Sequence, residues 1–307
     1  DHGIQRVVGM SRKRDFSRIA ASYHDRLEFI EGDITSLAQV QEAISSVAPN
    51  LIIHLAAFQT PDCMARPLQG MEVNVIGTRN IIQAASQLGS TLQRVVLASS
   101  SAVYGPREIY PGETVTTDVP YLPPNLYGFW KICNEGMGQA FHRETGIPTV
   151  CIRLSTCYGP GRDLGMTSAP TAMLKCAAAG QRFRMPYQGR EHFHFVGDVG
   201  AGFAEAAISP FKGYGAFNLR GITVHTEEFI RTIQQVGGEL GLENVDVGIE
   251  EGAQGMPFVN DLDAEAALEA FPAMSLTSIE DGIRVSLKAF KAMADAGELE
   301  AAYNPGG

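Results

Sequence analysis

Tyr127 and Lys131 lie four residues apart in a segment whose apolar residues recur at helical spacing. On a helix this spacing places both side chains on one face, with their polar ends close together. An ammonium group beside a phenol lowers the pKa of the phenol, so Tyr127 could exchange a proton near neutral pH while a hydride joins or leaves the same carbon. The same spacing arises by chance on many solvated helices, so the pair alone does not define a site.

Small and hydroxyl-bearing residues follow two strands that are predicted to be buried. Residues 94–98 lead into a serine triplet at 99–101, and residues 51–55 lead into Ala56 and Ala57. Ligands of parallel sheets bind at the carboxyl ends of the strands, where small residues let a flat cofactor approach the backbone. Serine-rich sequences are also common in the turns that follow strands, so these residues indicate a ligand site only in combination with Tyr127 and Lys131.

Short β-branched runs alternate with longer helical patterns in the first half of the chain. The predicted strands cover residues 6–10, 27–30, 51–55, 94–98 and 149–154. The predicted helices cover residues 35–47, 73–88, 126–143, 226–235 and 279–293. Strand–helix–strand alternation implies a parallel sheet with helices on both faces. We therefore predict an α/β fold, a Rossmann-like doubly wound parallel sheet with a smaller C-terminal substrate lobe.

The pattern also predicts two domains. Residues 1–157 would form the dinucleotide-binding, Rossmann-like domain. Residues 158–307 are punctuated by glycine and proline, as in a smaller lobe added to a sheet, and residues 191–221 are expected to return to the Rossmann-like core.

Composition excludes several classes of partner. The chain has 307 residues, 45% of them hydrophobic, and its formal net charge of −10 argues against nucleic acid. No apolar run approaches the roughly 20 residues of a membrane helix, and the first residues lack a signal-peptide pattern, so we expect a cytoplasmic protein without a membrane partner. The five cysteines are scattered without a CxxC pair, which predicts reduced thiols and no metal site.

Eight short motifs follow one another along nearly the whole chain. They are GDI at 32–34, HLAA at 54–57, NVIGT at 74–78, SSSAVYG at 99–105, YGFWK at 127–131, RLSTCYGPG at 153–161, FHFVGDV at 193–199 and FNLRG at 217–221. In type and order they resemble the landmarks of the extended short-chain dehydrogenase/reductases, the epimerase/dehydratase group. The resemblance implies an enzyme that uses a nicotinamide cofactor on a small-molecule substrate.

The resemblance also implies a role for each matching residue. Tyr127 would transfer the proton, Lys131 would lower the pKa of Tyr127 and bind the nicotinamide ribose, and Ser100 would hydrogen-bond the substrate oxygen. The predicted cofactor-binding residues are Ser11, Arg12, Asp33, Ile34, Leu55, Ala56, Ala57, Asn74, Tyr127 and Lys131. The predicted substrate-binding residues are Gln59, Ser101, Thr156, Arg162 and Arg190.

The sequence departs from the family pattern at its start. Family members open with a strand and a Gly-rich turn whose helix N-terminus receives the pyrophosphate, whereas this sequence opens near the second strand, at residues 6–10. We therefore expect a break in the middle of the sheet and weakened cofactor binding. Beyond residues 6–10, Ser11 precedes Arg12, Lys13 and Arg14, where NAD-preferring members carry an acid. Cations suit a 2′-phosphate, so NADP is favoured over NAD, which stays possible.

The substrate class is indicated by what is absent. Ser101 and Ala102 replace the acids that follow the catalytic hydroxyl in the dehydratases and decarboxylases of this family. Thr156 and Glu191 stand where nucleotide-sugar enzymes usually carry Asn and Arg, and a glutamate repels a diphosphate, although Arg190 is adjacent. We expect a dehydrogenase or reductase that acts on a small polyol, sugar acid or similar hydroxy or keto compound.

Two other functions remain open at this point. A sugar epimerase would use the same residues but return the hydride to the other face of the carbon, and a non-catalytic regulatory homologue would keep the fold without turnover. Family members often form homodimers through helices that correspond to residues 74–88 and 126–143, so we also expect a homodimer. The apolar residues of the second helix that would serve an interface, or equally the core, are Phe129, Cys133, Met137 and Phe141.

Overall fold

A four-stranded parallel sheet forms the centre of the computed structural model, which describes residues 3–16, 19–256, 259–301 and 303. Its strands are β3 (Leu51–His54), β4 (Arg94–Ser100), β5 (Thr149–Leu154) and β9 (Tyr214–Asn218), in the order β3-β4-β5-β9. β4 and β5 are buried along most of their length, as expected of parallel strands covered on both faces. The predicted Rossmann-like α/β fold is confirmed.

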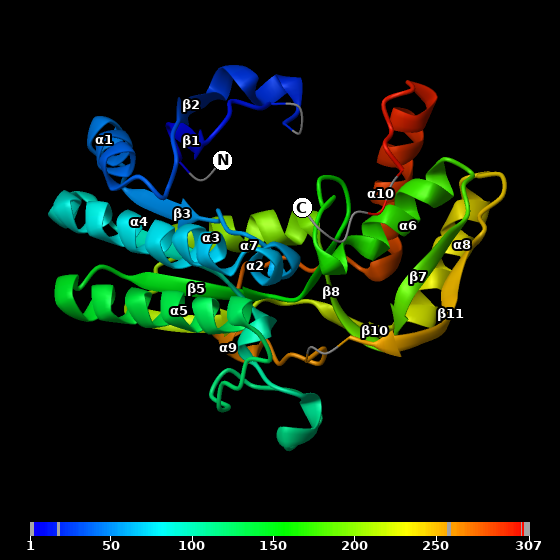
Figure 1. Cartoon of the computed structure of the whole chain (residues 1–307). Coiled ribbons are helices and arrows are strands. Elements are labelled where there is room, and N and C mark those ends of the chain that lie inside the picture. The colour runs from blue at the N-terminus through cyan, green and yellow to red at the C-terminus, as the bar shows by residue number, and fades with distance from the viewer. Residues whose placement is uncertain (1–2, 17–18, 257–258, 302, 304–307) are drawn as a thin grey trace.

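β1 (Val7–Ser11) and β2 (Leu27–Glu31) form a separate parallel pair, joined by a 3-10 helix (Ala21–Arg26). Figure 1 shows this pair standing apart from β3. Within the described part of the chain, β1 and β3 each pair with a strand on one edge only, and Val7 and Ile53 are 51% and 42% exposed. Among the described residues the parallel strands therefore form two separate sheets, β1-β2 and β3-β4-β5-β9.

Helices cover both faces of the four-stranded sheet. α5 (Leu126–Thr145) packs on β4, β5 and β9 beside α4 (Gly77–Ala85), and α1 (Leu37–Val47) packs on α4. α7 (Val196–Ile208) and α9 (Glu265–Ala270) lie on the other face (Figure 1). The alternation within β4 reflects this arrangement, because Val95 and Leu97 pack toward Phe141 of α5, whereas Val96 packs toward Phe203 of α7.

The segments between the strands include several short helices. The predicted helix at 73–88 is divided into a π-helical turn (Glu72–Ile76), α4 and a 3-10 turn (Ser86–Thr91). Two short helices that were not predicted precede it, α2 (Thr60–Ala65) and α3 (Pro67–Met71). Three more 3-10 turns cover Ser101–Val103, Arg107–Ile109 and Met166–Ser168.

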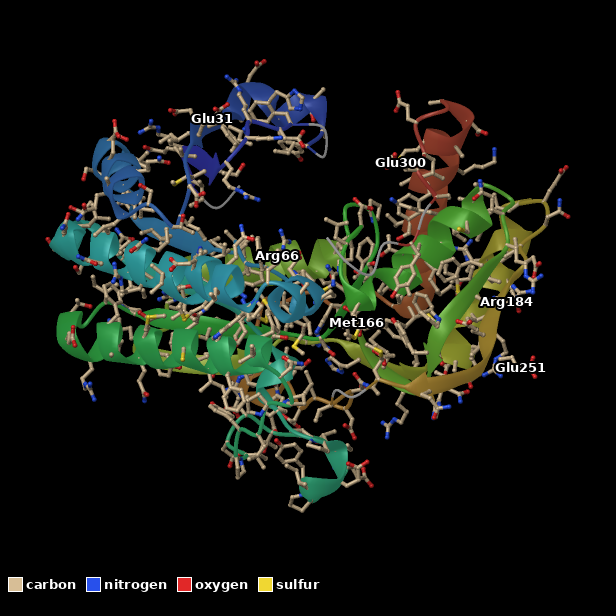
Figure 2. The ribbon with its side chains drawn as sticks, in the orientation of Figure 1. Glu31, Arg66, Met166, Arg184, Glu251 and Glu300 are labelled. Carbon is tan, nitrogen blue, oxygen red and sulfur yellow. The ribbon has the colours of Figure 1, made fainter. Side chains whose placement is uncertain are left out.

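The smaller lobe has two sheets of its own, with Arg184 and Glu251 on its outer side (Figure 2). One sheet orders β10 (Ile222–His225), β8 (Arg190–Phe195) and β6 (Thr156–Tyr158), and the other pairs β7 (Phe183–Gln188) with β11 (Val247–Gly255). The helices of the lobe are α6 (Ala169–Ala178), α8 (Thr226–Glu239) and α10 (Ile279–Asp295).

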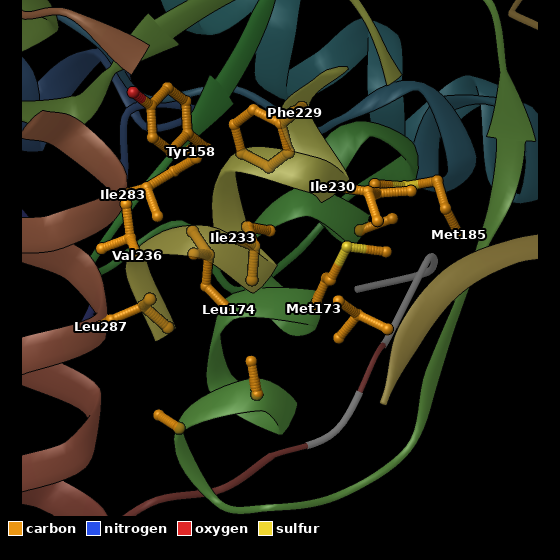
Figure 3. Close-up of a cluster of buried hydrophobic side chains, with 14 of the residues drawn as sticks. Tyr158, Met173, Leu174, Met185, Phe229, Ile230, Ile233, Val236, Ile283 and Leu287 are labelled. Atoms are coloured by element: carbon orange, nitrogen blue, oxygen red, sulfur yellow. The ribbon is translucent and has the colours of Figure 1, made fainter. Parts of the chain in front are cut away.

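The three helices of the lobe meet in an apolar core (Figure 3). Met173 and Leu174 from α6, Ile233 from α8, and Ile283 and Leu287 from α10 are each 0% exposed. Full burial of such a side chain stabilises the folded state by about 1.5–3 kcal/mol. The lobe therefore has a hydrophobic core separate from that of the central sheet.

The chain passes between the two parts more than once. β6 and β8 belong to the sheet of the lobe, after which α7 and β9 return to the central sheet, and α9 packs on β9. Residues 191–221 are thus divided, with most of β8 in the lobe and the rest against the central sheet. No helix in the described ranges is both long and apolar enough to cross a membrane.

Candidate active site

A cavity of about 620 Å³ lies where the carboxyl ends of β3, β4 and β5 meet the smaller lobe. Its wall on the side of the central sheet includes Leu55, Ala57, Ser100, Ser101, Tyr127 and Lys131. Its wall on the side of the lobe includes Thr156, Cys157, Arg162, Met166 and Thr167. Figure 2 shows Met166 at the junction between the two parts, and residues of both parts line the cavity.

Gly128 lets the start of α5 lie directly on the turn that follows β4. The side chain of Asn125 caps the helix by accepting a hydrogen bond from the Gly128 backbone N–H at 3.1 Å. A Cβ atom at position 128 would lie 2.1 Å from the backbone oxygen of Ala102, so only glycine fits. This close approach places the neighbouring residue, Tyr127, beside Ser100.

Tyr127 is 8% exposed and lines the cavity. Burial raises the pKa of its hydroxyl to about 12, and the hydrogen bond with Ser100 and the charge of Arg162 offset only part of this effect. The helical spacing of Lys131 and Tyr127 predicts a lowered pKa instead. The direction is the opposite because desolvation of the phenolate outweighs the neighbouring charges, so the hydroxyl is held protonated in this state.

Lys131 lies one helical turn further along α5, with its Nζ atom 5.5 Å from the centre of the Tyr127 ring. Nζ donates a hydrogen bond to the backbone oxygen of Ala98 at 2.7 Å, and burial lowers the pKa of the ammonium group to about 8. An ammonium group has three N–H donors. Because Lys131 lines the cavity, its other donors suit the hydroxyl groups of a cofactor ribose.

Ser100 is the last residue of β4 and the cap of the following turn. Its Oγ atom accepts a hydrogen bond from the Ala102 backbone N–H at 3.2 Å, and its side chain also forms a hydrogen bond with the side chain of Tyr127. Ser100, Tyr127 and Lys131 therefore meet on one wall of one cavity. The arrangement can exchange a proton with a substrate hydroxyl or carbonyl oxygen held between Ser100 and Tyr127.

Some of the predicted cofactor residues lie along the route into this cavity. Leu55 and Ala57 line it, and Ala56 is exposed between them. Ser11 and Arg12 lie outside it, exposed at the carboxyl end of β1. Asp33 follows β2, and hydrogen bonds from Thr35, together with the charge of Arg12, lower its pKa. The structure thus brings Arg12 and Asp33 into electrostatic contact at one edge.

The other two predicted cofactor residues have packing contacts. Ile34 fills the space beside Gly77, where a Cβ would lie 2.6 Å from its Cδ1 atom. Asn74 is fully buried, and its side-chain amide accepts from Phe58 N at 2.7 Å and donates to Phe58 O at 3.0 Å. Neither residue lines the cavity, so the structure gives them a structural role.

Four of the five predicted substrate residues line the cavity, namely Gln59, Ser101, Thr156 and Arg162. Arg190 does not. It is exposed and lines a second cavity of about 720 Å³, together with Arg107 and Asn260. Because side chains alternate along a strand, the next residue, Glu191, points the other way and accepts a hydrogen bond from Thr156 Oγ1 at 2.6 Å.

One wall of the cavity was not predicted. It comes from α7 and consists of Val196, Val199, Gly200, Phe203 and Ala204. The motif FHFVGDV at 193–199 marked the start of this helix, but the sequence does not show that the helix returns from the lobe to the cavity. No group of His, Cys, Asp and Glu side chains in the described ranges is arranged to hold a metal ion.

A buried ion pair beneath Ser100 was also not predicted. Glu135 Oε1 accepts hydrogen bonds from the Ser99 hydroxyl at 2.5 Å and from Arg153 Nε at 2.9 Å. Both charged side chains are almost fully buried, and they join α5, β4 and β5. Removing one partner of such a pair leaves an uncompensated buried charge, so this contact joins the three elements beneath Ser100 at a cost if it is broken.

Comparison with known proteins places the chain in a family. Residues 1–219 match the model described as the NAD dependent epimerase/dehydratase family. Since the match covers more than half of the sequence, the chain belongs to this family.

Curated relatives of the chain differ in their chemistry. A dTDP-L-rhamnose 4-epimerase from Burkholderia thailandensis is 28% identical over 170 residues, covering 46% of this chain and 47% of the relative. A D-erythronate dehydrogenase from Haemophilus influenzae is 26% identical over 207 residues, covering 65% of this chain and 64% of the relative. The chain thus spans about half the length of the first relative and under two thirds of the second.

Solved structures share the fold over nearly the whole chain. MoeE5 in complex with UDP-glucuronic acid and NAD has a TM-score of 0.71 at 22% identity, covering 96% of this chain and 92% of that one. A partial consensus L-threonine 3-dehydrogenase has a TM-score of 0.78 at 16% identity, covering 93% and 91%. At these identities the likeness establishes the fold.

Proposed function

We propose that this chain carries the catalytic site of an NAD(P)-dependent oxidoreductase. It would transfer a hydride to or from a secondary alcohol or ketone carbon of a small sugar-like or hydroxy-acid substrate. The observation that supports this most directly is the meeting of Ser100, Tyr127 and Lys131 in one cavity at the carboxyl ends of the parallel strands. In this proposal residues 1–157 hold the cofactor and residues 158–307 mainly hold the substrate.

Ser100, Tyr127 and Lys131 have separate roles in proton transfer. Bound NAD(P) supplies the hydride chemistry. Ser100 and Tyr127 hold the substrate oxygen, and Tyr127 as the phenolate takes the hydroxyl proton while the alcohol becomes a ketone, or as the phenol donates its proton to the forming alkoxide in the reverse direction. Lys131 binds the ribose and adds positive charge near the phenol, which favours the phenolate that burial disfavours. Leu55 and Ala57 provide a flat apolar approach to the same point.

The test is a substrate screen with direct detection of reduced cofactor. The chain is incubated with NADP or NAD and a panel of polyols, aldonic acids and small hydroxy acids, and the appearance of reduced nicotinamide is followed by absorbance. Net reduction of NADP or NAD in the presence of a small hydroxy compound is expected. Its absence across the panel, under conditions in which cofactor binding is verified by calorimetry, would count against a dehydrogenase.

A sugar epimerase is the second candidate, because relatives of the chain include a dTDP-L-rhamnose 4-epimerase. It would use the same Ser100 and Tyr127 but show no net change in cofactor. Interconversion of two sugar epimers, followed by NMR in the same reactions, separates this outcome from net oxidation. A regulatory homologue without turnover would show neither result.

NADP is the cofactor that the basic segment after β1 favours. Arg12 is exposed at the carboxyl end of β1, and its charge acts on Asp33 across the β1–β2 edge. If Arg12 contacts the 2′-phosphate, Arg12→Gln should weaken NADP binding about tenfold, or about 1.4 kcal/mol, and leave NAD binding nearly unchanged. Calorimetric titration of both cofactors measures this. Arg6→Gln, at the amino end of the same strand, is the matched control, and an equal loss for both cofactors would contradict the assignment.

We also propose that the chain forms a homodimer. The predicted interface comprises residues 74–88 and 126–143, and we extend it from α5 to α2 and α3, which pack beside α5 and carry exposed apolar residues. Met64, Leu68 and Phe129 are 58%, 78% and 54% exposed on these packed helices, and Cys133 is also exposed. Of the predicted interface residues, Phe141 belongs instead to the core. An apolar face of this kind suits a second copy of the same surface.

A paired substitution tests the dimer. Leu68→Asp with Phe129→Asp should convert a dimeric mass to a monomeric one in light scattering, because two charges would be buried at a self-complementary interface. Val285→Asp, a change at an exposed apolar residue of α10, should leave the mass unchanged. A monomeric mass for the unsubstituted chain would exclude this interface.

A further inference from the structure

Glu191 is a buried carboxyl group that lies just behind the lobe-side wall of the cavity. It is 1% exposed, its Oε2 atom accepts the hydroxyl of Thr156 at 2.6 Å, and its Oε1 atom accepts the side-chain amide of Asn260 at 3.2 Å. Both partners are neutral. Within the described part of the chain no Arg, Lys or His forms an ion pair with it, which is unusual for a buried acid.

Thr156 connects this carboxyl group to the cavity through a hydrogen bond. Thr156 lines the cavity, and when its hydroxyl hydrogen is given to Glu191, its oxygen keeps lone pairs that can accept a hydrogen bond from a ligand. A hydroxyl group on the ligand satisfies that oxygen. A phosphate oxygen offers only lone pairs and negative charge, and it would come close to the Glu191 carboxylate in a poorly solvated place.

We infer that the Thr156–Glu191 pair determines substrate specificity by accepting a hydrogen bond from a hydroxyl group of the substrate and excluding a phosphate or diphosphate. The inference rests on the proposed function, because it names the substrate class for the same cavity. It also explains why an acid can be kept at this position, where its burial is costly to stability.

The groups packed around Glu191 allow the inference to be tested by pH. Burial raises the pKa of Glu191 to about 7, so the carboxyl group is largely neutral at pH 6 and largely ionised at pH 8. Tyr187 of β7 has a pKa well above its ordinary value, and burial lowers the pKa of His192 to about 4, so neither changes charge in this range. The guanidinium group of Arg162 lies on the facing loop and lines the same cavity.

The experiment is calorimetric titration of UDP-glucose into the full chain at pH 6 and pH 8. This probe carries a bridged diphosphate and needs no turnover, so the result does not depend on success of the substrate screen. The unsubstituted chain should bind up to about tenfold more weakly at pH 8 than at pH 6, because the neutral fraction of Glu191 falls by that factor. Glu191→Gln removes the charge and keeps one oxygen that can accept from Thr156, and it should bind equally at both pH values and about tenfold more tightly than the unsubstituted chain at pH 8.

Two controls separate charge exclusion from a change in fold. Arg190→Gln alters the adjacent residue, which faces the second cavity, and should reproduce the pH dependence of the unsubstituted chain. Circular dichroism and thermal unfolding should show that Glu191→Gln is folded. Equal affinities of the unsubstituted chain and Glu191→Gln at pH 8, or no measurable binding by Glu191→Gln, would overturn the inference.

A second variant tests the hydroxyl side of the inference. For a hydroxy substrate found in the screen, Thr156→Val should raise KM about tenfold with little change in kcat, because it removes the acceptor without touching Ser100, Tyr127 or Lys131. An unchanged KM would contradict the role of Thr156. Failure of the screen itself would count against the proposed function and leave the UDP-glucose result standing.

Discussion

Tyr127→Phe should lower kcat by about 10²- to 10⁴-fold while leaving the fold and cofactor affinity nearly intact. The change removes only the hydroxyl that exchanges a proton with the substrate oxygen, and the ring that packs beside Cys63, Ala102 and Trp130 is kept. Steady-state kinetics with the best substrate from the screen give kcat, and calorimetry gives the affinity for NADP.

Tyr104→Phe is the matched control for this prediction. Tyr104 is also a buried tyrosine that does not line the cavity, and its hydroxyl donates a hydrogen bond to Asn218 at 2.7 Å and accepts one from Arg153 at 2.6 Å. The same deletion there should cost about 2–3 kcal/mol of stability, because the buried guanidinium loses an acceptor, and should lower kcat by less than tenfold. If Tyr127→Phe kept most of its turnover, or if both variants lost it equally, Tyr127 would not be the proton-transfer residue.

The Rossmann-like half of the fold could be predicted because its signals are local. β4 and β5 each contain a run of apolar residues, at 95–98 and 150–152, and α5 shows both a polar cap at Asn125 and a terminal Gly146 with a φ of 73°. The strands of the lobe gave no such signal. β8 reads REHFHF, and its buried residues include Glu191, His192 and His194, whose burial depends on partners that are distant in sequence.

The candidate site shows the same division between local and tertiary information. The spacing of Tyr127 and Lys131 predicts that they share a helix face, but not that the phenol is desolvated enough to raise its pKa to about 12. Likewise, the sequence places Arg190 and Glu191 side by side without showing which one faces the cavity. That choice follows from the register of β8 against β6 and β10, where Thr156 lies opposite Phe193 and Val224 opposite Glu191.

Acid should destabilise this protein because three buried histidines must be neutral in the folded state. Burial lowers the pKa of His54 to about 4, of His192 to about 4 and of His194 to about 3. In the unfolded chain each returns to about 6.5, so between pH 6.5 and 4 the unfolded state binds more protons. The stability that these residues contribute is present above pH 6.5 and is lost as the pH falls, by roughly 1 kcal/mol per pH unit for each histidine.

Glu191 has the opposite effect on stability as the pH falls, so the prediction distinguishes its contribution from that of the histidines. Because burial raises its pKa to about 7, the folded state binds the extra proton between pH 7 and 4.5, and this group alone would stabilise the protein as the pH falls. Three histidines against one glutamate leave a net loss of roughly 2 to 3 kcal/mol in the free energy of unfolding between pH 6 and pH 5. Urea unfolding at both pH values measures this difference.

Single substitutions at these sites should change the pH dependence in opposite directions. His194→Asn removes one titrating histidine and should roughly halve the loss between pH 6 and pH 5, whatever its effect on stability at neutral pH. Glu191→Gln removes the opposing group and should make the loss about half as large again. His225→Asn, at an exposed position of β10, should leave the difference in unfolding free energy between pH 6 and pH 5 unchanged, since that side chain is 62% exposed. If neither His194→Asn nor Glu191→Gln altered the pH dependence, these residues would not control the acid sensitivity. The ionisation of Glu191 would then no longer support its role in substrate selection.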